Sequence, residues 1–184
     1  MEFEFFILDW IQTHLRHPIL DPIIVFITTL GNAGILWIGL TILLAVRKST
    51  RKTAAALAVA LGLCLLCGNL LLKPLIGRIR PFNVQDAITL LIAAPLDYSF
   101  PSGHTMSSFA AAMVLLLTDR RMGIPVMLLA GLIAFSRMYL YVHYPTDVLA
   151  GLLMGCLFGW LAVRIVQKLH AHRFQGNQQE KPHR

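Results

Sequence analysis

Three short segments of this chain place cations, histidines and a carboxylate at the edges of otherwise apolar stretches. They are Lys73–Pro81 (KPLIGRIRP), Pro101–His104 (PSGH) and Ser136–Asp147 (SRMYLYVHYPTD). Ionisable side chains at membrane depth are costly and usually functional. The oxygens of a phosphate ester repel a nucleophile, so cleavage needs cations that neutralise them and a nucleophile held in line with phosphorus. Together the three segments supply these groups.

The cations suited to phosphate are Lys73, Arg80 and Arg137. Lys73 and Arg80 are seven residues apart, close to two helical turns, so they face the same way if a helix continues to Pro81, which would then end it. The planar guanidinium of Arg137 suits phosphate oxygens. Between the first two cations, Arg78 is expected at the surface or near lipid headgroups.

Pro101–His104 is expected to open a helix. Ser102 can act as the N-cap of that helix, and Gly103 leaves its backbone amide exposed. The free N–H groups at a helix N-terminus form a site for an anion.

His143 and Asp147 are four residues apart, about one helical turn. A carboxylate that holds one imidazole nitrogen orients the ring and makes the other nitrogen a better nucleophile. Pro145 suits the first turn of the helix that follows. The alternative is a structural His–Asp pair that joins two helices.

In order and spacing, the three segments resemble the signature of the type-2 phosphatidic acid phosphatase superfamily: K-x6-RP, PSGH and SR-x5-H-x3-D. The resemblance runs from Lys73 to Asp147, with a match at each motif position. It implies that His143 is the nucleophile and forms a phosphohistidine, and that Asp147 orients it. It implies that His104 protonates the leaving oxygen and then helps to activate water. The phosphate-binding residues that it implies are Lys73, Arg80, Ser102, Gly103 and Arg137. Neither a metal nor another cofactor is implied, because the cations would do a metal's electrostatic work.

The composition is typical of a membrane protein. Of the 184 residues, 57% are hydrophobic and 14% are charged, against about 25% charged in an ordinary soluble domain. Several apolar stretches approach the roughly 20 residues that cross a bilayer. We therefore expect an all-α polytopic membrane bundle of five or six helices. The predicted spans are 22–45, 53–75, 103–118 (short for a full crossing), 124–142 and 146–167.

Polarity divides the chain into three parts. Residues 1–18 lack the pattern of a cleavable signal peptide and predict an amphipathic helix. This helix either lies in the membrane interface, with Trp10 at headgroup level, or packs against the bundle. Residues 19–169 are expected to form the membrane-embedded lipid phosphatase domain, and residues 170–184 predict a polar, disordered cytoplasmic tail.

Some local features leave alternatives open. Gly31-Asn32 either kinks the first span or is tolerated within one helix. Asn69 is expected to hydrogen-bond to another helix. Segment 82–100 predicts either a short interfacial helix at the rim of the site or a plain loop. Glycine recurs at every fourth residue in the last span, which predicts close helix packing, with homodimer formation as the alternative. These glycines are Gly151, Gly155 and Gly159.

The net charge of +7 does not indicate a nucleic-acid partner, because it is not gathered on one face of a soluble domain. Eleven of the sixteen Lys and Arg residues lie within the last turn of the first, third or fifth predicted span or after it. By the positive-inside rule these clusters are cytoplasmic. The three motif segments would then face the extracytoplasmic side of the plasma membrane.

The pattern predicts an enzyme that hydrolyses a membrane lipid phosphate or diphosphate presented from the bilayer. Within the superfamily that the chain resembles, the first expectation is an undecaprenyl diphosphate phosphatase, which recycles a cell-wall carrier lipid. Phosphatidylglycerophosphate and phosphatidate are the alternative substrates, and a lipid phosphotransferase would use the same residues with another acceptor. The hypothesis from a different class is a non-catalytic lipid-binding membrane protein, which loss of His143, His104 or Arg137 would mark. All three residues are present.

Overall fold

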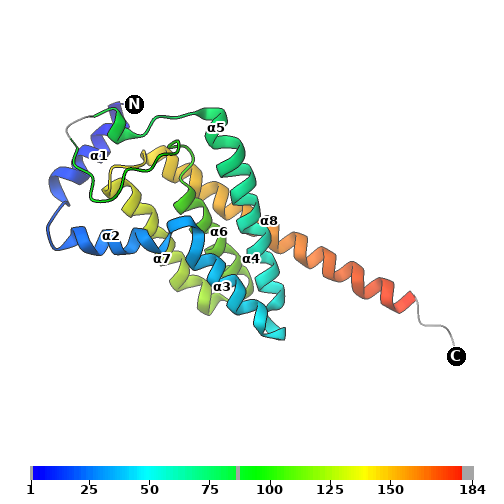
Figure 1. Cartoon of the computed structure of the whole chain (residues 1–184). Helices are drawn as coiled ribbons and strands as arrows, with labels where there is room; N and C mark the ends of the chain where they lie inside the picture. The colour runs from blue at the N-terminus through cyan, green and yellow to red at the C-terminus, as the bar shows by residue number, and fades with distance from the viewer. Residues whose placement is uncertain (1, 86–87, 180–184) are drawn as a thin grey trace.

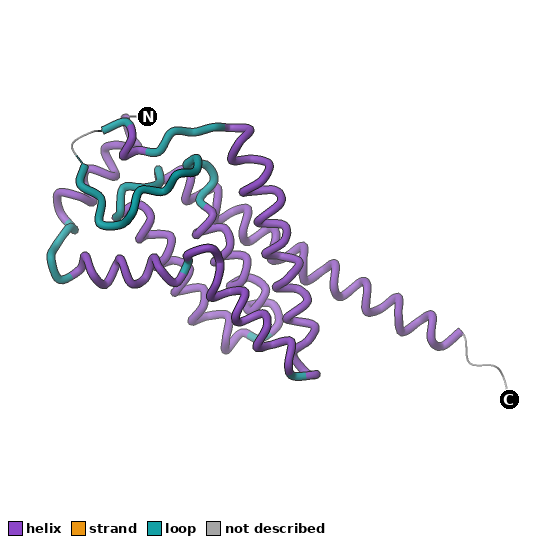
Figure 2. The backbone as a smooth tube through the Cα atoms, in the orientation of Figure 1, coloured by secondary structure: helices purple, strands orange, loops and turns teal. Residues whose placement is uncertain are grey.

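The computed structural model of the chain describes residues 2–85 and 88–179, and helices form all the regular secondary structure in this part (Figure 2). The long helices lie side by side in one bundle, from which the C-terminal half of α8 projects (Figure 1). The predicted all-α bundle is thus confirmed. The α-helices are α1 (Glu2–His14), α2 (Leu20–Leu30), α3 (Ile35–Val46), α4 (Arg51–Leu63), α5 (Lys73–Ile76), α6 (Gly103–Thr118), α7 (Arg120–Tyr139) and α8 (Pro145–Gln179). The shorter pieces are η1 (Asn32–Gly34), η2 (Lys48–Thr50), η3 (Cys64–Leu72) and η4 (Pro81–Asn83).

Within the described residues, three helical stretches are long and apolar enough to cross a membrane: Lys48–Asn83, Arg120–Tyr139 and Pro145–Ala171. The bent pair Leu20–Leu30 and Asn32–Val46 is long and apolar enough for a fourth span if its two helices are counted as one. α6 is apolar but shorter, as its predicted range of 103–118 indicated.

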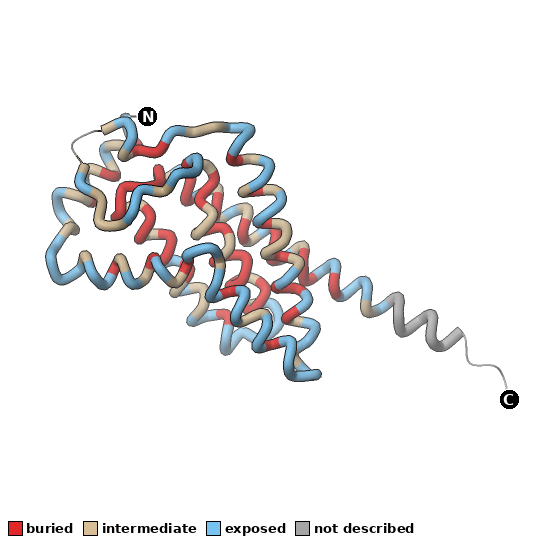
Figure 3. The backbone as a smooth tube through the Cα atoms, viewed as in Figure 1, coloured by how far each residue is buried: buried red, intermediate tan, exposed pale blue. Residues whose placement is uncertain are grey.

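α6 is the central helix of the bundle. It packs most extensively against α8 and α7, and less extensively against α4. Most of its residues from Thr105 to Leu115 are buried, as the colours of Figure 3 show. Helices in lipid associate mainly through van der Waals contact, so small side chains at their interface favour such close packing.

The glycines that recur in α8 face α6. A Cβ atom added at Gly151 would lie 2.8 Å from the Ser102 carbonyl oxygen, and at Gly155 it would lie 2.4 Å from the Met106 carbonyl oxygen. Neither position admits a side chain unless a helix moves. The predicted close packing is therefore found inside this chain, and it holds the start of α6 against the start of α8.

The first span is broken, which was one of the two alternatives. α2 and α3 meet at 41°, and the backbone of Ala33 and Gly34 is left-handed, with φ values of 50° and 67°. Gly31 lies against His104, because a Cβ atom added there would be 2.7 Å from the ring Cδ2 atom. The break therefore brings this turn close to the start of α6.

The second span runs from α4 through the π-helical η3 to α5. Pro74 has no N–H group to donate into the helix, and local π-type turns are one way in which membrane helices accommodate proline. α5 ends at Ile76, where Gly77 takes a left-handed conformation with φ of 60°. The expectation that Lys73 and Arg80 share a helix face is therefore wrong, because Arg80 lies in the extended backbone that follows the helix.

α1 packs on the bundle with one face and exposes apolar side chains on the other. Leu8 and Ile11 are buried, and α1 contacts α7 and α8. Phe3, Phe6 and Trp10 are exposed, as expected for a helix in the membrane interface. The two alternatives for this segment describe opposite faces of one helix.

Two connecting or terminal segments complete the description. The helix assignment of α8 continues to Gln179, and residues 180–184, the end of the predicted tail, lie outside the described part. In its described residues, segment 82–100 contains the turn η4 and is otherwise a loop.

The connections separate into two ends of the bundle (Figure 1). The α3–α4 and α6–α7 turns, which carry Arg47–Lys52 and Arg120–Arg121, lie at one end. The loop before α6 and the α7–α8 connection, which carry the motifs, lie at the other end. The basic turns and the motif segments therefore lie at opposite ends of the bundle, as the count of Lys and Arg residues in the sequence assumed.

Candidate active site

All three motif segments meet at the loop end of the bundle, around a cavity of about 310 Å³. Six of the eight predicted site residues line it. They are Lys73, Arg80, Gly103, His104, Arg137 and His143. The other two, Ser102 and Asp147, are buried close by, and the Ser102 N–H donates to the Asp147 carbonyl oxygen at 3.1 Å.

His143 lies in the connection between α7 and α8, and it is buried. The Nε2 atom of its ring is 3.2 Å from Arg80 Nη1. The Nδ1 atom is 3.5 Å from both Asp147 Oδ2 and Ser99 Oγ. One ring nitrogen therefore faces the cations, and the other faces a carboxylate and a hydroxyl group.

Asp147 stands in the first turn of α8 and accepts several hydrogen bonds. Its Oδ2 atom accepts from the Tyr144 N–H at 2.9 Å and from the Ser99 hydroxyl group. The backward bond to Tyr144 is half of a capping box at the helix start. At 3.5 Å the distance to His143 exceeds that of an ordinary hydrogen bond, about 2.7–3.2 Å. Ser99, which the sequence analysis missed, therefore shares the orienting side of the imidazole ring.

The pKa of His143 is held well below its usual value of 6.5. Burial of the ring is the largest cause, and the positive charges of Arg80, Arg137 and Lys73 act in the same direction. The imidazole is therefore neutral at physiological pH, and its unprotonated nitrogen carries the lone pair that a nucleophile needs.

Arg80 is buried, and its guanidinium group is fixed by several acceptors. Nη1 donates to the Val142 carbonyl oxygen at 2.6 Å, and Nε donates to the Asp97 carbonyl oxygen at 2.8 Å. Because Val142 directly precedes His143, these bonds fix the cation relative to the imidazole ring.

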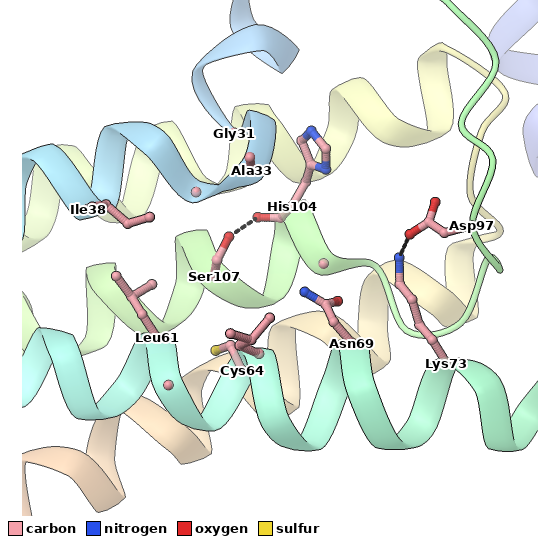
Figure 4. A pocket seen from close by; sticks show the side chains of 14 residues that line it. Gly31, Ala33, Ile38, Leu61, Cys64, Asn69, Lys73, Asp97, His104 and Ser107 are labelled. Carbon is pink, nitrogen blue, oxygen red and sulfur yellow. Dashed lines mark hydrogen bonds and ion pairs between the residues drawn. The ribbon is translucent and has the colours of Figure 1, made fainter.

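Asp97 is a second residue that the sequence analysis missed. Its carboxylate pairs with both the Lys73 amine and the Arg80 guanidinium, and Figure 4 shows Lys73 reaching it from the α4–α5 helix. Burial alone would raise the pKa of Asp97, but hydrogen bonds from Lys73 and Arg80 and their charges outweigh it and lower the pKa to about 2. The carboxylate thus occupies a position suited to phosphate oxygens. Its sequence signal was a single acidic residue shortly before PSGH.

Arg137 brings an unpaired donor to the cavity. Its side chain is 2% exposed, and Nη1 donates to the Thr28 hydroxyl group. The buried Nε atom has no hydrogen-bond partner among the described residues. Burying such a donor without an acceptor is unfavourable, so the geometry fits a bound anion.

His104 stands in the first turn of α6, with Nε2 2.9 Å from Asn32 Oδ1. Ser102 is the N-cap residue, as predicted, but its hydroxyl group accepts from Thr105 and makes no capping bond to the backbone. The first amides of α6 therefore remain available to an anion. The broken first span supplies Asn32, which the sequence analysis did not connect with the site.

Arg78 was expected at the surface or near lipid headgroups. Its side chain is 22% exposed, and it also binds residues of the site, a role that the sequence analysis missed. Its Nη1 atom donates to Asp147 Oδ1 at 2.6 Å and to Thr146 Oγ1 at 2.7 Å. Its Nη2 atom pairs with Glu4 Oε2 at 2.6 Å, and the guanidinium lies 3.9 Å from the centre of the Tyr144 ring. α1 thus reaches the site through Glu4.

A second cavity, of about 380 Å³, adjoins the first and shares Lys73, Asp97, Gly103 and His104 with it. Asn69 lines this second cavity (Figure 4). The expected interhelical hydrogen bond of Asn69 is not formed by its Oδ1 atom, which is buried and has no partner in the described part of the chain.

Comparison with known proteins identifies the class of protein that this fold and site define. The model of the PAP2 superfamily matches residues 51–171, and the chain belongs to this superfamily of membrane phosphatases. An undecaprenyl-diphosphatase from Sulfolobus acidocaldarius is 37% identical over 147 residues, which cover 79% of this chain and 70% of that protein. The undecaprenyl-diphosphatase BcrC from Bacillus subtilis is 33% identical over 149 residues, or 81% of this chain and 76% of that protein. The crystal structure of Aquifex aeolicus LpxE is similar with a TM-score of 0.77 and 29% identity, covering 88% of this chain and 95% of that one.

Proposed function

We propose that this membrane phosphatase hydrolyses a lipid diphosphate, with undecaprenyl diphosphate as the first choice, through a phosphohistidine on His143. The observation that carries the proposal is the convergence of a buried, neutral imidazole and three cations on one cavity, where Arg137 Nε has no acceptor. Cations held in place before the substrate arrives stabilise the charge that develops on phosphate oxygens. Two of the relatives are undecaprenyl-diphosphatases, which supports the choice of lipid.

The first chemical step forms the covalent intermediate. The Nε2 lone pair of His143 attacks phosphorus, a P–N bond forms, and the bond from phosphorus to the leaving oxygen breaks. His104 enters this step protonated, a state that the negative charge of the bound diphosphate favours. It donates its proton to that oxygen, which departs with the lipid phosphate. Asp147 and Ser99 hold the Nδ1 side of the ring during the attack, and Lys73, Arg80 and Arg137 neutralise the phosphate oxygens.

The second step restores the enzyme. His104, now neutral, takes a proton from water as the water oxygen attacks phosphorus. The P–N bond to His143 breaks, and inorganic phosphate leaves. General acid–base assistance of this kind typically contributes about 10²–10⁴-fold to the rate, so His104→Ala is expected to lose activity within that range.

We propose that catalysis needs no metal ion. The reason is chemical: Lys73, Arg80 and Arg137 provide the positive charge that a divalent ion supplies in other phosphoryl-transfer sites. Activity should therefore persist in excess EDTA. Loss of activity on chelation, with recovery after addition of a divalent ion, contradicts this part of the proposal.

We assign the site to the extracytoplasmic face of the plasma membrane. The basic α3–α4 and α6–α7 turns lie at the opposite end of the bundle from the motifs (Figure 1), and short basic connections remain in the cytoplasm.

The test of the function is phosphate release by the purified protein from a panel of lipids in matched detergent. The panel contains undecaprenyl diphosphate, phosphatidylglycerophosphate and phosphatidate, and we expect kcat/KM to be highest for the first. A higher value for either glycerophospholipid favours the alternative substrates. Transfer of phosphate to a lipid acceptor in place of water favours a phosphotransferase, and no turnover of any lipid favours a non-catalytic lipid-binding protein.

A further inference from the structure

The break in the first span contributes to the phosphate cavity, although the superfamily model matches the chain only from residue 51. From this span the cavity is lined by Thr28, Thr29 and Asn32. All eight residues of the predicted site lie between Lys73 and Asp147. The turn between α2 and α3 therefore brings side chains to the site that the three motifs do not account for.

The backbone of this turn takes a conformation that is unfavourable for alanine. Ala33 is left-handed, with φ of 50°, and there the Cβ atom of an L-residue approaches the following carbonyl oxygen too closely. Such positions persist where the surrounding contacts hold them, and they gather at functional sites. In the described part of the chain, the other non-glycine residue with positive φ is Tyr141, two positions before His143. The outlier at Ala33 thus points to contacts that fix the turn.

Those contacts are made with the ring of His104. A Cβ atom added at Gly31 would lie 2.7 Å from the ring Cδ2 atom and 3.4 Å from Cγ, so the backbone of the turn packs directly against one edge of the imidazole. The next residue, Asn32, places its Oδ1 atom 2.9 Å from the ring Nε2 atom. Figure 4 shows Ala33 of this turn beside the ring. The ring is therefore held by packing along one edge and by a hydrogen bond at one nitrogen.

The hydrogen bond to Asn32 decides which nitrogen of His104 can exchange a proton. An amide oxygen only accepts hydrogen bonds, so a bond to Oδ1 requires the proton on Nε2. This holds for the neutral ring and for the imidazolium alike. Nδ1 is then the nitrogen that gains and loses a proton, and His104 lines the phosphate cavity where that proton is needed.

The partners of the two site histidines differ in charge. His143 has the carboxylate of Asp147 beside it, whereas His104 has the neutral amide of Asn32. A neighbouring carboxylate favours the protonated form of a histidine, which would hinder the return of the proton from His104. An amide orients the ring without adding a negative charge, so it suits a group that acts first as an acid and then as a base.

We propose that Asn32 is the positioning residue of the acid/base His104, and that proton transfer takes place at Nδ1. The proposal rests on the proposed function and deepens it. In the first step the Nδ1–H bond breaks as an O–H bond forms on the leaving oxygen, while Nε2–H stays bonded to Asn32 Oδ1. In the second step Nδ1 takes a proton from the attacking water, which restores the imidazolium.

The test compares two soluble substrates that differ in their leaving group. Phenyl phosphate depends more on a general acid than p-nitrophenyl phosphate does, because phenolate is the stronger base. We compare kcat/KM, which covers formation of the phosphohistidine and not its hydrolysis. Asn32→Leu keeps the size of the side chain and removes the acceptor. It should lower kcat/KM about 10-fold or more for phenyl phosphate and no more than about 3-fold for p-nitrophenyl phosphate, within the range of general acid catalysis.

Two further variants complete the comparison. Asn32→Asp keeps an oxygen acceptor, so it should return the ratio of the two kcat/KM values to within about 3-fold of that of the unmodified protein. The matched control is Asn83→Leu, which makes the same change at an exposed position of η4 that does not line the phosphate cavity. It should leave both substrates within about 2-fold, as expected for a surface substitution.

A double mutant tests whether Asn32 acts through His104. In a His104→Ala background, Asn32→Leu should lower kcat/KM for phenyl phosphate no further, because residues that act as one unit are not additive. A second loss as large as the first overturns the proposal. Equal losses of Asn32→Leu on the two aryl phosphates, or no loss on either, also overturn it.

The remaining outcomes separate this proposal from the proposed function. An Asn32→Asp ratio as low as that of Asn32→Leu contradicts the assignment of the proton to Nε2. If Asn32→Leu does not fold, Asn32→Ala gives the same comparison. Unmodified protein that hydrolyses the aryl phosphates but not undecaprenyl diphosphate contradicts the proposed lipid alone, and protein that hydrolyses neither contradicts both proposals.

Discussion

Arg78 and Asp147 form a direct ion pair, with 2.6 Å between Nη1 and Oδ1. The same guanidinium pairs with Glu4 of the N-terminal helix α1, and Asp147 lies against the imidazole ring of His143. A chain of contacts therefore runs from α1 to the proposed nucleophile. Arg78 does not line the phosphate cavity, so its contribution is to position another group.

Arg78→Ala is expected to lower kcat roughly 10-fold to 100-fold, about 1.4 to 2.7 kcal/mol in activation free energy, with little change in KM. The reason is that Asp147 loses the partner of its Oδ1 atom while the phosphate cations stay in place. Arg78→Lys should recover only part of the rate, because one amine cannot reproduce the fork that bonds both carboxylates. Steady-state kinetics on protein shown to be folded by its melting temperature checks this expectation.

The matched control for Arg78 is Arg16→Ala. Arg16 follows the end of α1 and pairs with Asp21 at 3.8 Å, near the surface, where an ion pair contributes about 0–1 kcal/mol. If kcat falls no further for Arg78→Ala than for Arg16→Ala, Arg78 does not position Asp147.

Asp97→Asn should strengthen inhibition by vanadate and by inorganic phosphate. The Asp97 carboxylate pairs with Lys73 and Arg80 and must give up these cations when an anion binds. Vanadate adopts the five-coordinate geometry of phosphorus under attack, so it reports on transition-state binding. We expect the inhibition constant to fall by about 10-fold, which corresponds to 1.4 kcal/mol. Asp119→Asn, at the start of α7, is the control, and unchanged or weaker inhibition of Asp97→Asn contradicts the competition.

The pH dependence of turnover follows from the surroundings of His143. Its pKa lies below 6.5 because of burial and the nearby cations, so the ring stays neutral as the pH falls through 6.5 and is protonated only at lower pH. The nucleophile should therefore stay unprotonated below the ordinary histidine range. When turnover of p-nitrophenyl phosphate is measured between about pH 5 and 8, its acid limb should lie below pH 6.5. An acid limb of kcat/KM centred on the ordinary histidine value contradicts the assignment.

Membrane orientation can be tested by thiol labelling in a background without Cys64, Cys67 and Cys156. Val84→Cys, on the motif side, should react in intact cells with a reagent that does not cross membranes. Thr50→Cys, in the basic α3–α4 turn, should react only after the cells are broken. The reverse pattern would place the active site in the cytoplasm.

Several site residues were predictable from the sequence because their chemistry is conspicuous in an apolar chain. Lys73, His104, Arg137 and His143 are costly in a membrane, and their fixed spacing indicated one site. The structure gathers them at one cavity. The bundle and its spans were predictable for a related reason, since long apolar stretches have few stable forms in lipid.

Residues whose role depends on the path of a loop were not predictable. Asp97 and Ser99 act because the loop before α6 folds back over the cations and the imidazole ring. Glu4 meets Arg78 across 74 positions of sequence, and no local pattern links them. The shared face expected for Lys73 and Arg80 failed for a local reason, because the helix stops at Gly77.

The central claim, that His143 forms a covalent bond to phosphorus, can be tested by trapping the intermediate. Protein is mixed with radiolabelled undecaprenyl diphosphate, quenched in alkali, where phosphohistidine survives, and the labelled peptide is identified by mass spectrometry. The label should be found on His143 in the unmodified protein and in the control His14→Ala, whose histidine is exposed on α1. His143→Ala should carry no label and have no turnover. Label on another residue, or near-normal turnover by His143→Ala, would contradict the account.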